Sequence, residues 1–573
     1  MSVFVAFTLV VALLSAANPI ANGAPIMWND DFVKRCSTAF CLGDSTFPFI
    51  GFNTYNLMSW YSPYFAIEVL SKGADLGMTV CRTWAFNDGY HKNDANGIWK
   101  DNTALQMGPG DFSEETFKVL DHVIYQAAQH GVRLMLPFVN YWEDYGGREM
   151  YVHWSAENGG GAKKADDFYT NWKCRQYYKN AVKTILNRKN SYNGRIYKDD
   201  PAIFGWELMN EPRNYADSSG NTLQAWIDEM SAFVKSIDSR HLLSVGSEGF
   251  FGRSSYQGYQ DIAGSWALAT GVDSLRNSAG ANIDFATTHI YTDSWWPRNT
   301  FTDQMSRFNR LNKGHDWESF AMLGKPIVLT EFGKRDKNWV DMSRRDNMLS
   351  TAFYDVYQSA VNYRAFFGAV LWMLAGDKQP NPGGFYVYSP SSVWPKHDTV
   401  LKTIKTGSHR LFDKARVPAV VPIFFDRVYY GWSDWSWDID IDFQQTFVGQ
   451  TGIRTATGRR SVYVKHKSAG SALRLRTQTW FTSYATTLSF SIYGSWNGVH
   501  VQLMTDKNHK SQQASIWQGS SVIDLPSGFK QIRMPLQQLS YNGVWNSVAF
   551  QVVGTNDKPY YLMDISISKN SWP

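Results

Sequence analysis

The fold is decided by a short stretch of the chain, residues 203–212, which reads IFGWELMNEP. A short apolar run of this kind is typical of a buried strand. The run ends in acidic residues, and a carboxylate at the end of an apolar strand is costly unless a ligand or partner uses it. Residues 327–333, IVLTEFG, repeat the pattern and place Glu331 where the first stretch places Glu211. We therefore expect buried strands that end in functional acids.

Short β-rich segments alternate with amphipathic stretches between residues 49 and 376. The segments cover residues 49–55, 79–86, 133–140, 203–210, 241–247, 285–291, 327–332 and 369–374, and helical patterns cover 63–76, 114–130, 167–187, 222–238, 302–324 and 342–363. This alternation predicts an α/β fold, a (β/α)8 TIM barrel. A doubly wound open sheet is the alternative. It would want a glycine-rich phosphate loop after its first strand, and the sequence FNTY at 52–55 is not one.

The spacing of the two glutamates agrees with a barrel. If Glu211 ends the fourth strand and Glu331 the seventh, the 120 residues between them make three units of 40. Eight strands over this region require about 41 residues a unit. Reacting groups in such barrels lie at the carboxyl ends of strands, so the two acids would face each other across the mouth. Two facing carboxylates suggest glycoside hydrolysis, and a retaining enzyme would hold them about 5–5.5 Å apart. A structural ion pair is the alternative for either glutamate alone.

Several blocks in order resemble glycoside hydrolase family 5, in particular its plant and fungal endo-β-1,4-mannanases. The blocks are VCRTWAF at 80–86, YKDDP at 197–201, WELMNEPR at 206–213, THIY at 288–291 and TEFGK at 330–334. The resemblance runs from about residue 28 to about residue 412. Residues 150–165 and 292–301 depart from it and are expected to be loops at the mouth of the barrel that shape the outer subsites.

The resemblance implies roles for individual residues. Glu211 would be the general acid/base and Glu331 the nucleophile of a double displacement. Arg82 and Tyr291 would donate to Glu331 and keep its pKa low. His289 would lie beside Glu211 and the substrate. No metal or other cofactor is implied.

The resemblance also implies substrate-binding residues. Asn210 would hydrogen-bond the 2-hydroxyl of the attacked sugar, and Trp372 would be the platform under that sugar. The family often has a cis peptide bond after this tryptophan, so we expect one between Trp372 and Met373. Trp84 would be a further stacking wall. The remaining expected cleft residues are Trp142, Arg213 and Trp295.

These observations predict a retaining endo-β-1,4-mannanase that cuts internal bonds of mannan, galactomannan or glucomannan and acts as a monomer. An endo-β-1,4-glucanase or a mannan transglycosylase on the same site are alternatives, as is a non-catalytic wall-binding protein. The chain carries 56 Lys and Arg against 51 Asp and Glu, so its charge of +5 gives no argument for nucleic acid as a partner. Aromatic residues make up 16% of the chain, with 24 Trp. Their flat apolar rings with polar edges suit sugars.

The first residues predict secretion. Residues 3–14 form an apolar run too short to span a bilayer. Residues 1–23 therefore resemble a signal peptide, although no Lys or Arg precedes the run. After its removal no membrane association is expected. Secretion permits disulfides, and four cysteines allow three pairings. We favour Cys36–Cys41, with Cys81 and Cys174 as free, buried thiols.

The chain changes character near residues 417–422, VPAVVP. We expect residues 24–412 to form the catalytic domain, 413–422 a linker, and 423–573 an antiparallel β-sandwich. From Pro422 onward there are 14 Lys and Arg, 9 Asp and no Glu, so the tail carries the whole net charge. YYGWSDWSW at 429–437 and YYLMDI at 560–565 resemble the outer strands of jelly-roll, galactose-binding-like domains. A carbohydrate-binding role is therefore predicted for the tail. Its candidate stacking residues are Trp432, Trp435, Trp437, Trp480, Trp496, Trp517 and Trp545.

Overall fold

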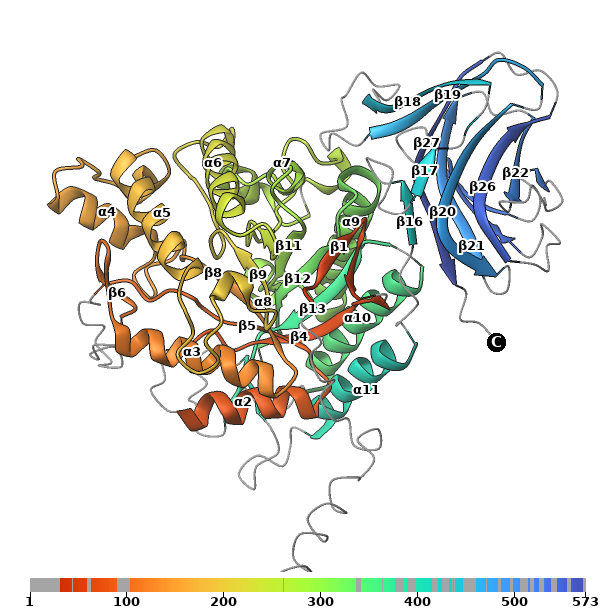
Figure 1. The fold of residues 1–573 in the computed structure, drawn as a ribbon. Coiled ribbons are helices and arrows are strands. Elements are labelled where there is room, and N and C mark those ends of the chain that lie inside the picture. Colours follow the sequence, from red (N-terminus) through yellow and green to blue (C-terminus); the bar gives the residue numbers. More distant parts are fainter. Residues whose placement is uncertain are drawn as a thin grey trace, which may run out of the picture.

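The computed structural model of the chain shows a strand barrel wrapped in helices and, toward the C-terminus, a pair of β-sheets (Figure 1). It describes residues 31–569 except positions 44, 59–62, 90–103, 261, 336–341, 363, 377–384, 389–397, 415–420, 425–431, 435, 437, 447–459, 470, 483–485, 495–497, 505–513, 516–519, 525–529, 537–543 and 554–557. The predicted signal peptide, residues 1–23, and most of the predicted linker lie outside the described residues.

Parallel strands build the barrel, and three of the neighbouring strand pairs contain a register shift. In chain order they are β4 (Phe49–Asn53), β5 (Val80–Arg82), β8 (Arg133–Pro137), β9 (Ile203–Glu207), β10 (Leu242–Ser244), β11 (Ala286–Ile290), β12 (Ile327–Phe332) and β13 (Phe366–Leu371). The last strand pairs with the first. The seam between β10 and β11 is joined just beyond β10, where the N–H of His289 donates to the carbonyl of Glu248 at 3.0 Å. The predicted barrel is confirmed, and the open-sheet alternative is wrong.

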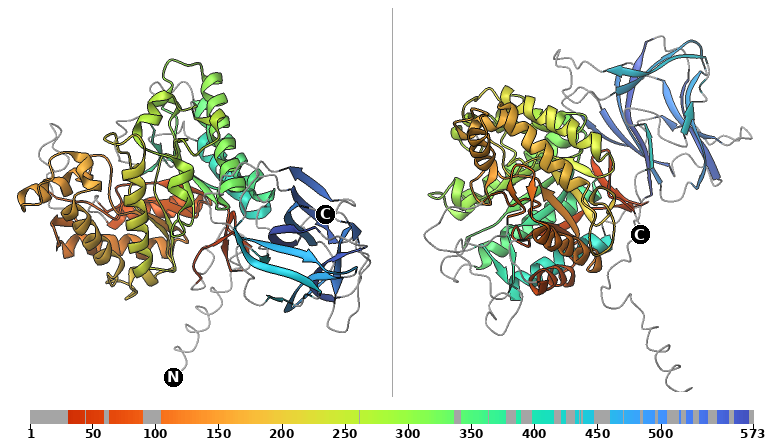
Figure 2. Two further views of the ribbon diagram at one scale, coloured as in Figure 1. Left: turned by 90° about the horizontal axis from the view of Figure 1, so that it is seen from above. Right: turned by 60° about the vertical axis from the view of Figure 1, so that its left-hand side comes forward.

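Helices form the outer layer (Figure 2). They are α2 (Pro63–Asp75), α3 (Glu114–Gln129), α5 (Trp172–Leu186), α6 (Asn221–Ile237), α7 (Ser274–Ala279), α9 (Phe301–Glu318), α10 (Met342–Val361) and α11 (Asp398–Lys414). The sequence explains several of their starts. The side chains of Ser113, Asn171 and Thr300 accept hydrogen bonds from the first N–H groups of α3, α5 and α9.

Three predicted features of the outer layer differ from the structure. Residues 150–165 are not a loop throughout, because α4 (Gly147–Glu157) covers their first half. The helical pattern at 167–187 is split, since a 3-10 turn, η1 (Ala165–Tyr169), ends before Asn171 begins α5. A short helix, α8 (Thr292–Trp295), also begins the predicted loop at 292–301.

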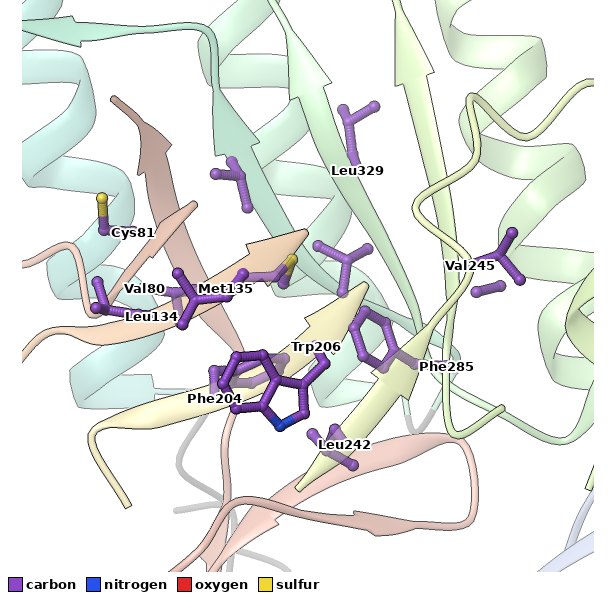
Figure 3. Packing of buried hydrophobic residues seen from close by; sticks show 14 of the residues in the cluster. Val80, Cys81, Leu134, Met135, Phe204, Trp206, Leu242, Val245, Phe285 and Leu329 are labelled. Carbon is purple, nitrogen blue, oxygen red and sulfur yellow. The ribbon is translucent and has the colours of Figure 1, made fainter. Parts of the chain in front are cut away.

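A hairpin closes the amino end of the barrel. It consists of β1 (Lys34–Cys36), β2 (Ala39–Leu42) and β3 (Ser45–Thr46). Phe40 on β2 is fully buried, and its ring lies 5.1 Å from Phe204 and 5.5 Å from Phe285. Figure 3 shows Phe204 and Phe285 among the buried hydrophobic residues of the barrel. The hairpin therefore plugs the barrel with an aromatic side chain.

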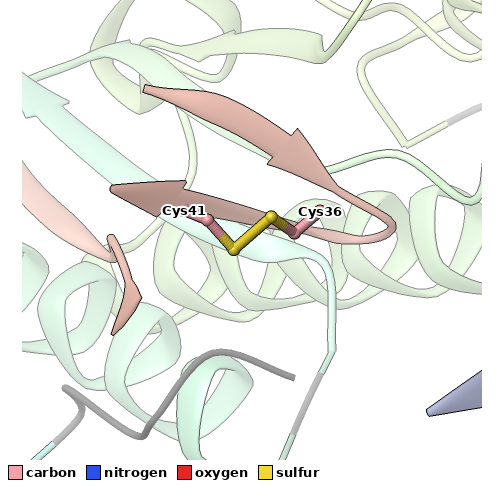
Figure 4. The surroundings of a disulfide bond; sticks show 2 residues. All are labelled: Cys36 and Cys41. Carbon is pink, nitrogen blue, oxygen red and sulfur yellow. A yellow bond between two sulfur atoms is a disulfide. The ribbon is translucent and has the colours of Figure 1, made fainter. Parts of the chain in front are cut away.

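The cysteines pair as predicted. Cys36 and Cys41 form a disulfide across the β1–β2 hairpin (Figure 4). Cys81 and Cys174 are free and buried. The single disulfide thus belongs to the hairpin that plugs the barrel.

The C-terminal part forms two antiparallel sheets. One contains β18 (Ile439–Thr446), β19 (Arg460–His466), β27 (Tyr560–Lys569), β21 (Thr486–Gly494), β25 (Lys530–Pro535), β24 (Ser521–Asp524) and β16 (Val421–Phe424); the other contains β17 (Trp432–Asp434), β20 (Ala472–Thr482), β26 (Val544–Val552), β22 (Val499–Met504) and β23 (Ala514–Ser515). Both sheets contribute to one apolar core, for example Val464, Leu475 and Phe550. The predicted sandwich is confirmed. The side chains of its candidate stacking tryptophans lie outside the described residues.

Among the described helices, none is apolar over a length that would traverse a bilayer.

Candidate active site

Two carboxylates meet at the carboxyl end of the barrel. Glu331 lies within β12, and Glu211 follows the end of β9 at Glu207. One carboxylate oxygen of each and a ring nitrogen of His289 lie within 4.8 Å of one another. Both glutamates are buried, with exposed fractions of 8% for Glu211 and 4% for Glu331. The strand ends thus bring together side chains that are 120 residues apart in the sequence.

The backbone around Glu211 is held between two neighbouring strands. The N–H of Asn210 donates to the carbonyl of Val139 at 2.8 Å, and the N–H of Glu211 donates to the carbonyl of Gly246 at 2.9 Å. Glu211 has φ 54°, in the left-handed region. A non-glycine residue there costs about 1–3 kcal/mol and persists only where its surroundings fix it. These hydrogen bonds supply that constraint.

Glu331 accepts two strong hydrogen bonds. Arg82 Nη1 donates to one of its oxygens at 2.5 Å, and the Tyr291 hydroxyl donates to the other at 2.6 Å. Burial raises the pKa of Glu331 above its usual value, although His289, Arg82 and Tyr291 each lower it, so the low pKa expected for Glu331 is not found. Each oxygen of Glu331 thus has a fixed donor, which sets the orientation of the carboxylate.

Arg82 connects Glu331 with Glu207 and Asn210. It is fully buried and donates through Nε to Glu207 at 2.8 Å and through Nη2 to the side-chain oxygen of Asn210 at 2.7 Å. Asn210 in turn donates its amide to Asn140 at 2.9 Å. These hydrogen bonds connect residues at the carboxyl ends of β5, β8 and β9.

Glu211 has a different set of partners. Its Oε1 lies 2.6 Å from His289 Nδ1, and its Oε2 accepts from Trp142 Nε1 at 2.6 Å. Burial raises the pKa of Glu211, but the hydrogen bond and charge of His289, the hydrogen bond from Trp142 and the charge of Arg213 together bring it to about 2. Burial lowers the pKa of His289, but the charges of Glu331 and Glu211 raise it overall. Both pKa shifts favour a charged pair, with a carboxylate on Glu211 and the proton on the imidazole of His289.

Aromatic rings flank the site on the side of Glu331. We call this group the first wall; it consists of Tyr55, Trp84, Tyr291 and Trp372. Trp372 stacks on Tyr55 with ring centroids 5.3 Å apart and lies 6.4 Å from Trp84. Tyr291 contacts Phe385 with ring centroids 5.5 Å apart. The partly buried rings of Tyr55, Tyr291 and Trp372 pack against a buried cluster that includes Phe385 and Met373. The Trp372–Met373 peptide bond is cis, as predicted.

A second wall begins at Glu211. Arg213 binds Glu248 through two hydrogen bonds of 2.7 and 2.6 Å. Its guanidinium lies over the rings of Trp142 at 5.1 Å and of Trp266 at 5.6 Å. Trp295 continues this wall, with its ring centroid 6.0 Å from Trp266. The three sequence-derived cleft residues Trp142, Arg213 and Trp295 thus lie along one side of the site.

Three further residues of the site were not predicted from the sequence: Glu207, Glu248 and Trp266. Glu207 stands inside the quoted stretch, and Glu248 directly follows the fifth β-rich segment, HLLSVGS at 241–247. The rule used for Glu211, an acid after an apolar strand, would have found both. Trp266 follows no strand and no motif, so only the fold reveals its place.

Within the described residues, Glu211, His289 and Glu331 are also the one group with the spacing of metal ligands. Their atoms already engage Trp142, Arg82, Tyr291 and each other. This donor set fits proton transfer between acids and bases better than coordination of an ion.

Comparison with known proteins identifies the family. A family model described as GH family 5 beta-mannosidase-like matches residues 30–396. The chain belongs to glycoside hydrolase family 5. The resemblance drawn from the sequence blocks is confirmed at this level.

Relatives within family 5 include plant and fungal proteins. The chain is 42% identical to mannan endo-1,4-beta-mannosidase 5 of Arabidopsis thaliana over 349 residues, which cover 60% of the chain and 78% of that protein. It is 29% identical to the endo-1,4-beta-mannanase of Rhizomucor miehei, with a TM-score of 0.56, covering 67% of the chain and all of that structure. The match to an endo-beta-1,4-mannanase structure from Thermotoga petrophila covers 89% of this chain and 98% of that one, with a TM-score of 0.55 and 24% identity. This last likeness concerns the fold alone.

Proposed function

We propose that this family 5 chain is a retaining endo-β-1,4-mannanase, with Glu211 as general acid/base and Glu331 as nucleophile. The observation that carries the proposal is the pair of buried carboxylates within 4.8 Å of a shared histidine, each with its own donors. Retaining glycosidases hold their carboxyl groups about 5–5.5 Å apart, whereas inverting ones leave about 6.5–9.5 Å for a water. The names of the relatives, mannan endo-1,4-beta-mannosidase among them, support the substrate class.

In the first step Glu331 attacks the anomeric carbon and forms a glycosyl-enzyme, while Glu211 protonates the departing oxygen. Arg82 and Tyr291 hold Glu331 at the correct angle, since each of its oxygens has a fixed donor. Asn210 would bind the 2-hydroxyl of the attacked sugar, and Trp372 and Trp84 would stack under and beside that sugar.

In the second step water replaces the departed sugar. Glu211 takes a proton from this water, the water oxygen attacks the anomeric carbon, and Glu331 leaves as a carboxylate. The configuration is thereby retained.

The proton for the first step comes from the Glu211–His289 pair. The imidazole holds this proton 2.6 Å from Glu211 Oε1 and can pass it to the acid when the leaving oxygen accepts one. We assign His289 this supply, since the pKa of Glu211 beside His289 is about 2, too low for Glu211 itself to keep the proton near neutral pH.

The test replaces each carboxylate by its amide. Glu211→Gln and Glu331→Gln should each lower kcat on galactomannan by at least about 10³-fold, because each removes a group required in the transition state. Glu115→Gln is the matched control, as its side chain on α3 is 69% exposed. A Glu211→Gln enzyme with full mannan hydrolysis would show that the acid is another group.

A second arm assigns the nucleophile. Glu211→Ala with an aryl mannoside, whose leaving group needs no acid, should accumulate a glycosyl-enzyme. Peptide mass spectrometry should find the sugar on Glu331, and a sugar on any other residue would contradict the assignment.

The substrate class is tested separately. Reducing ends should appear with glucomannan and galactomannan but not with carboxymethyl-cellulose, and the opposite result would favour an endo-β-1,4-glucanase. Products longer than the starting oligosaccharides would favour the transglycosylase. Secretion, a monomeric state and a carbohydrate-binding role for the sandwich are also part of the proposal.

A further inference from the structure

The two aromatic walls can be assigned to the two sides of the scissile bond by the carboxylate that each one contacts. Tyr291 in the first wall donates to Glu331. Trp142 in the second wall donates to Glu211. If Glu211 protonates the leaving oxygen, the second wall lies on the leaving-group side. This step depends on the proposed function.

We propose that Trp266 is a sugar-binding residue on the leaving-group side, beyond Trp142, and that with Trp295 it binds the more distant sugars of the departing chain. Trp266 is 37% exposed, whereas Phe250 behind it is 2% exposed. Its ring packs edge-on against Phe250 at 4.9 Å and Trp295 at 6.0 Å. An indole that keeps free surface while its base is packed is a suitable platform for the apolar face of a sugar.

The path from the acid to Trp266 is continuous. The guanidinium of Arg213 lies over both Trp142 and Trp266, at 5.1 and 5.6 Å. Arg213 is held in place by its two hydrogen bonds to the buried Glu248. A sugar chain that leaves Glu211 along Trp142 therefore meets Trp266 next on this wall.

The segment that carries Trp266 is shaped to present the indole. Trp266 lies in η4 (Ser265–Thr270), directly after Gly264 with φ 116°. A Cβ at Gly264 would lie 2.8 Å from the indole, so only glycine leaves room for the ring in this position. The far end of η4 is tied to the active-site chain, because the N–H of Asn214 donates to the carbonyl of Thr270 at 2.7 Å. This hydrogen bond joins the segment that carries Trp266 to the residue next to Arg213.

The experiment compares substrates that reach Trp266 with one that does not. Trp266→Ala is expected to lower kcat/KM on mannohexaose about tenfold, equivalent to about 1.4 kcal/mol. The same variant should keep kcat/KM on an aryl mannobioside within about twofold, since the aryl group leaves no sugars on that side. With hexaose labelled at its reducing end, cleavage should move toward products with fewer sugars on the leaving side. Trp172→Ala is the control, because Trp172 is 62% exposed on α5 and takes no part in either wall.

The outcomes separate this inference from the proposed function. Equal losses on hexaose and on the aryl substrate would show that Trp266 only supports the structure, and the inference would be wrong. An unchanged cleavage pattern would overturn it as well. If the unaltered enzyme failed to cut any mannan, the proposed function itself would fail.

Discussion

At the scale of single residues, Gly246 decides where Glu211 stands. Its carbonyl accepts the N–H of Glu211, and its own φ is 81°. A Cβ there would lie 2.1 Å from the carbonyl oxygen of Met209, so the chain around Glu211 would have to move. Displacements of about 1 Å at a catalytic group can cost about 10²-fold in rate.

Gly246→Ala should therefore lower kcat on mannan by about 10²-fold and also lower the melting temperature. Gly159→Ala is the matched control, since Gly159 also has a positive φ, 73°, but nothing lies within 4 Å of its Cβ position. The control should lose only about 1–2 kcal/mol of folding stability, which is the cost of a non-glycine residue at this positive φ. Equal activity in the two variants would show that the site tolerates a shift of this segment.

The pKa directions predict a bell-shaped pH profile of kcat/KM. Glu331 must be ionised to attack, and its pKa is raised above 4.5, so activity is lost as the pH falls through that raised value. The Glu211–His289 pair must keep its proton. The pKa of His289 is raised above 6.5, so activity is lost as the pH rises through that value. His289→Gln should move the alkaline limb to lower pH, and an unmoved limb would rule out His289 as the proton store.

At the scale of elements, the strands were predictable because a barrel strand is buried on both faces and therefore forms a continuous apolar run. Seven strands lie within the predicted segments, and β13 begins three residues before residue 369. Helix α4 escaped prediction because its buried face includes Gly147 and Arg148, which break the apolar period. Arg148 is buried against the ring of Tyr141 at 3.8 Å, a contact that no local pattern indicates.

The hairpin that plugs the barrel gives a prediction for stability. Phe40→Ala should lower the free energy of unfolding by about 3–5 kcal/mol, because it empties a space between Phe204 and Phe285 at the amino end of the barrel. Activity per folded molecule should be kept, since the carboxylates lie at the opposite end. Denaturant unfolding measures the loss, with Tyr64→Ala, at a ring that is 79% exposed, as the control. A loss below about 1 kcal/mol would contradict the plug.

At the scale of the whole molecule, the sequence indicated which residues gather but not how they bind one another. The acid-after-strand rule and the family blocks pointed to Glu211, Glu331 and Arg82. The contact of Arg82 with Glu207 and the bridge of Arg213 between two tryptophans arise from side chains on different strands and loops. Such contacts depend on the closed barrel, so no spacing along the chain predicts them.

The barrel and the sandwich have separate apolar cores, and this separation makes the role of the sandwich testable. A chain that ends at Lys414, the last residue of α11, should keep kcat/KM on soluble galactomannan within about twofold. It should lose binding to insoluble mannan, because a tethered binding domain raises the local concentration of substrate. Binding is measured by co-sedimentation, with Glu211→Gln in both lengths so that the polymer stays intact. If the short chain sedimented with mannan as well as the full chain does, the sandwich would have no binding role.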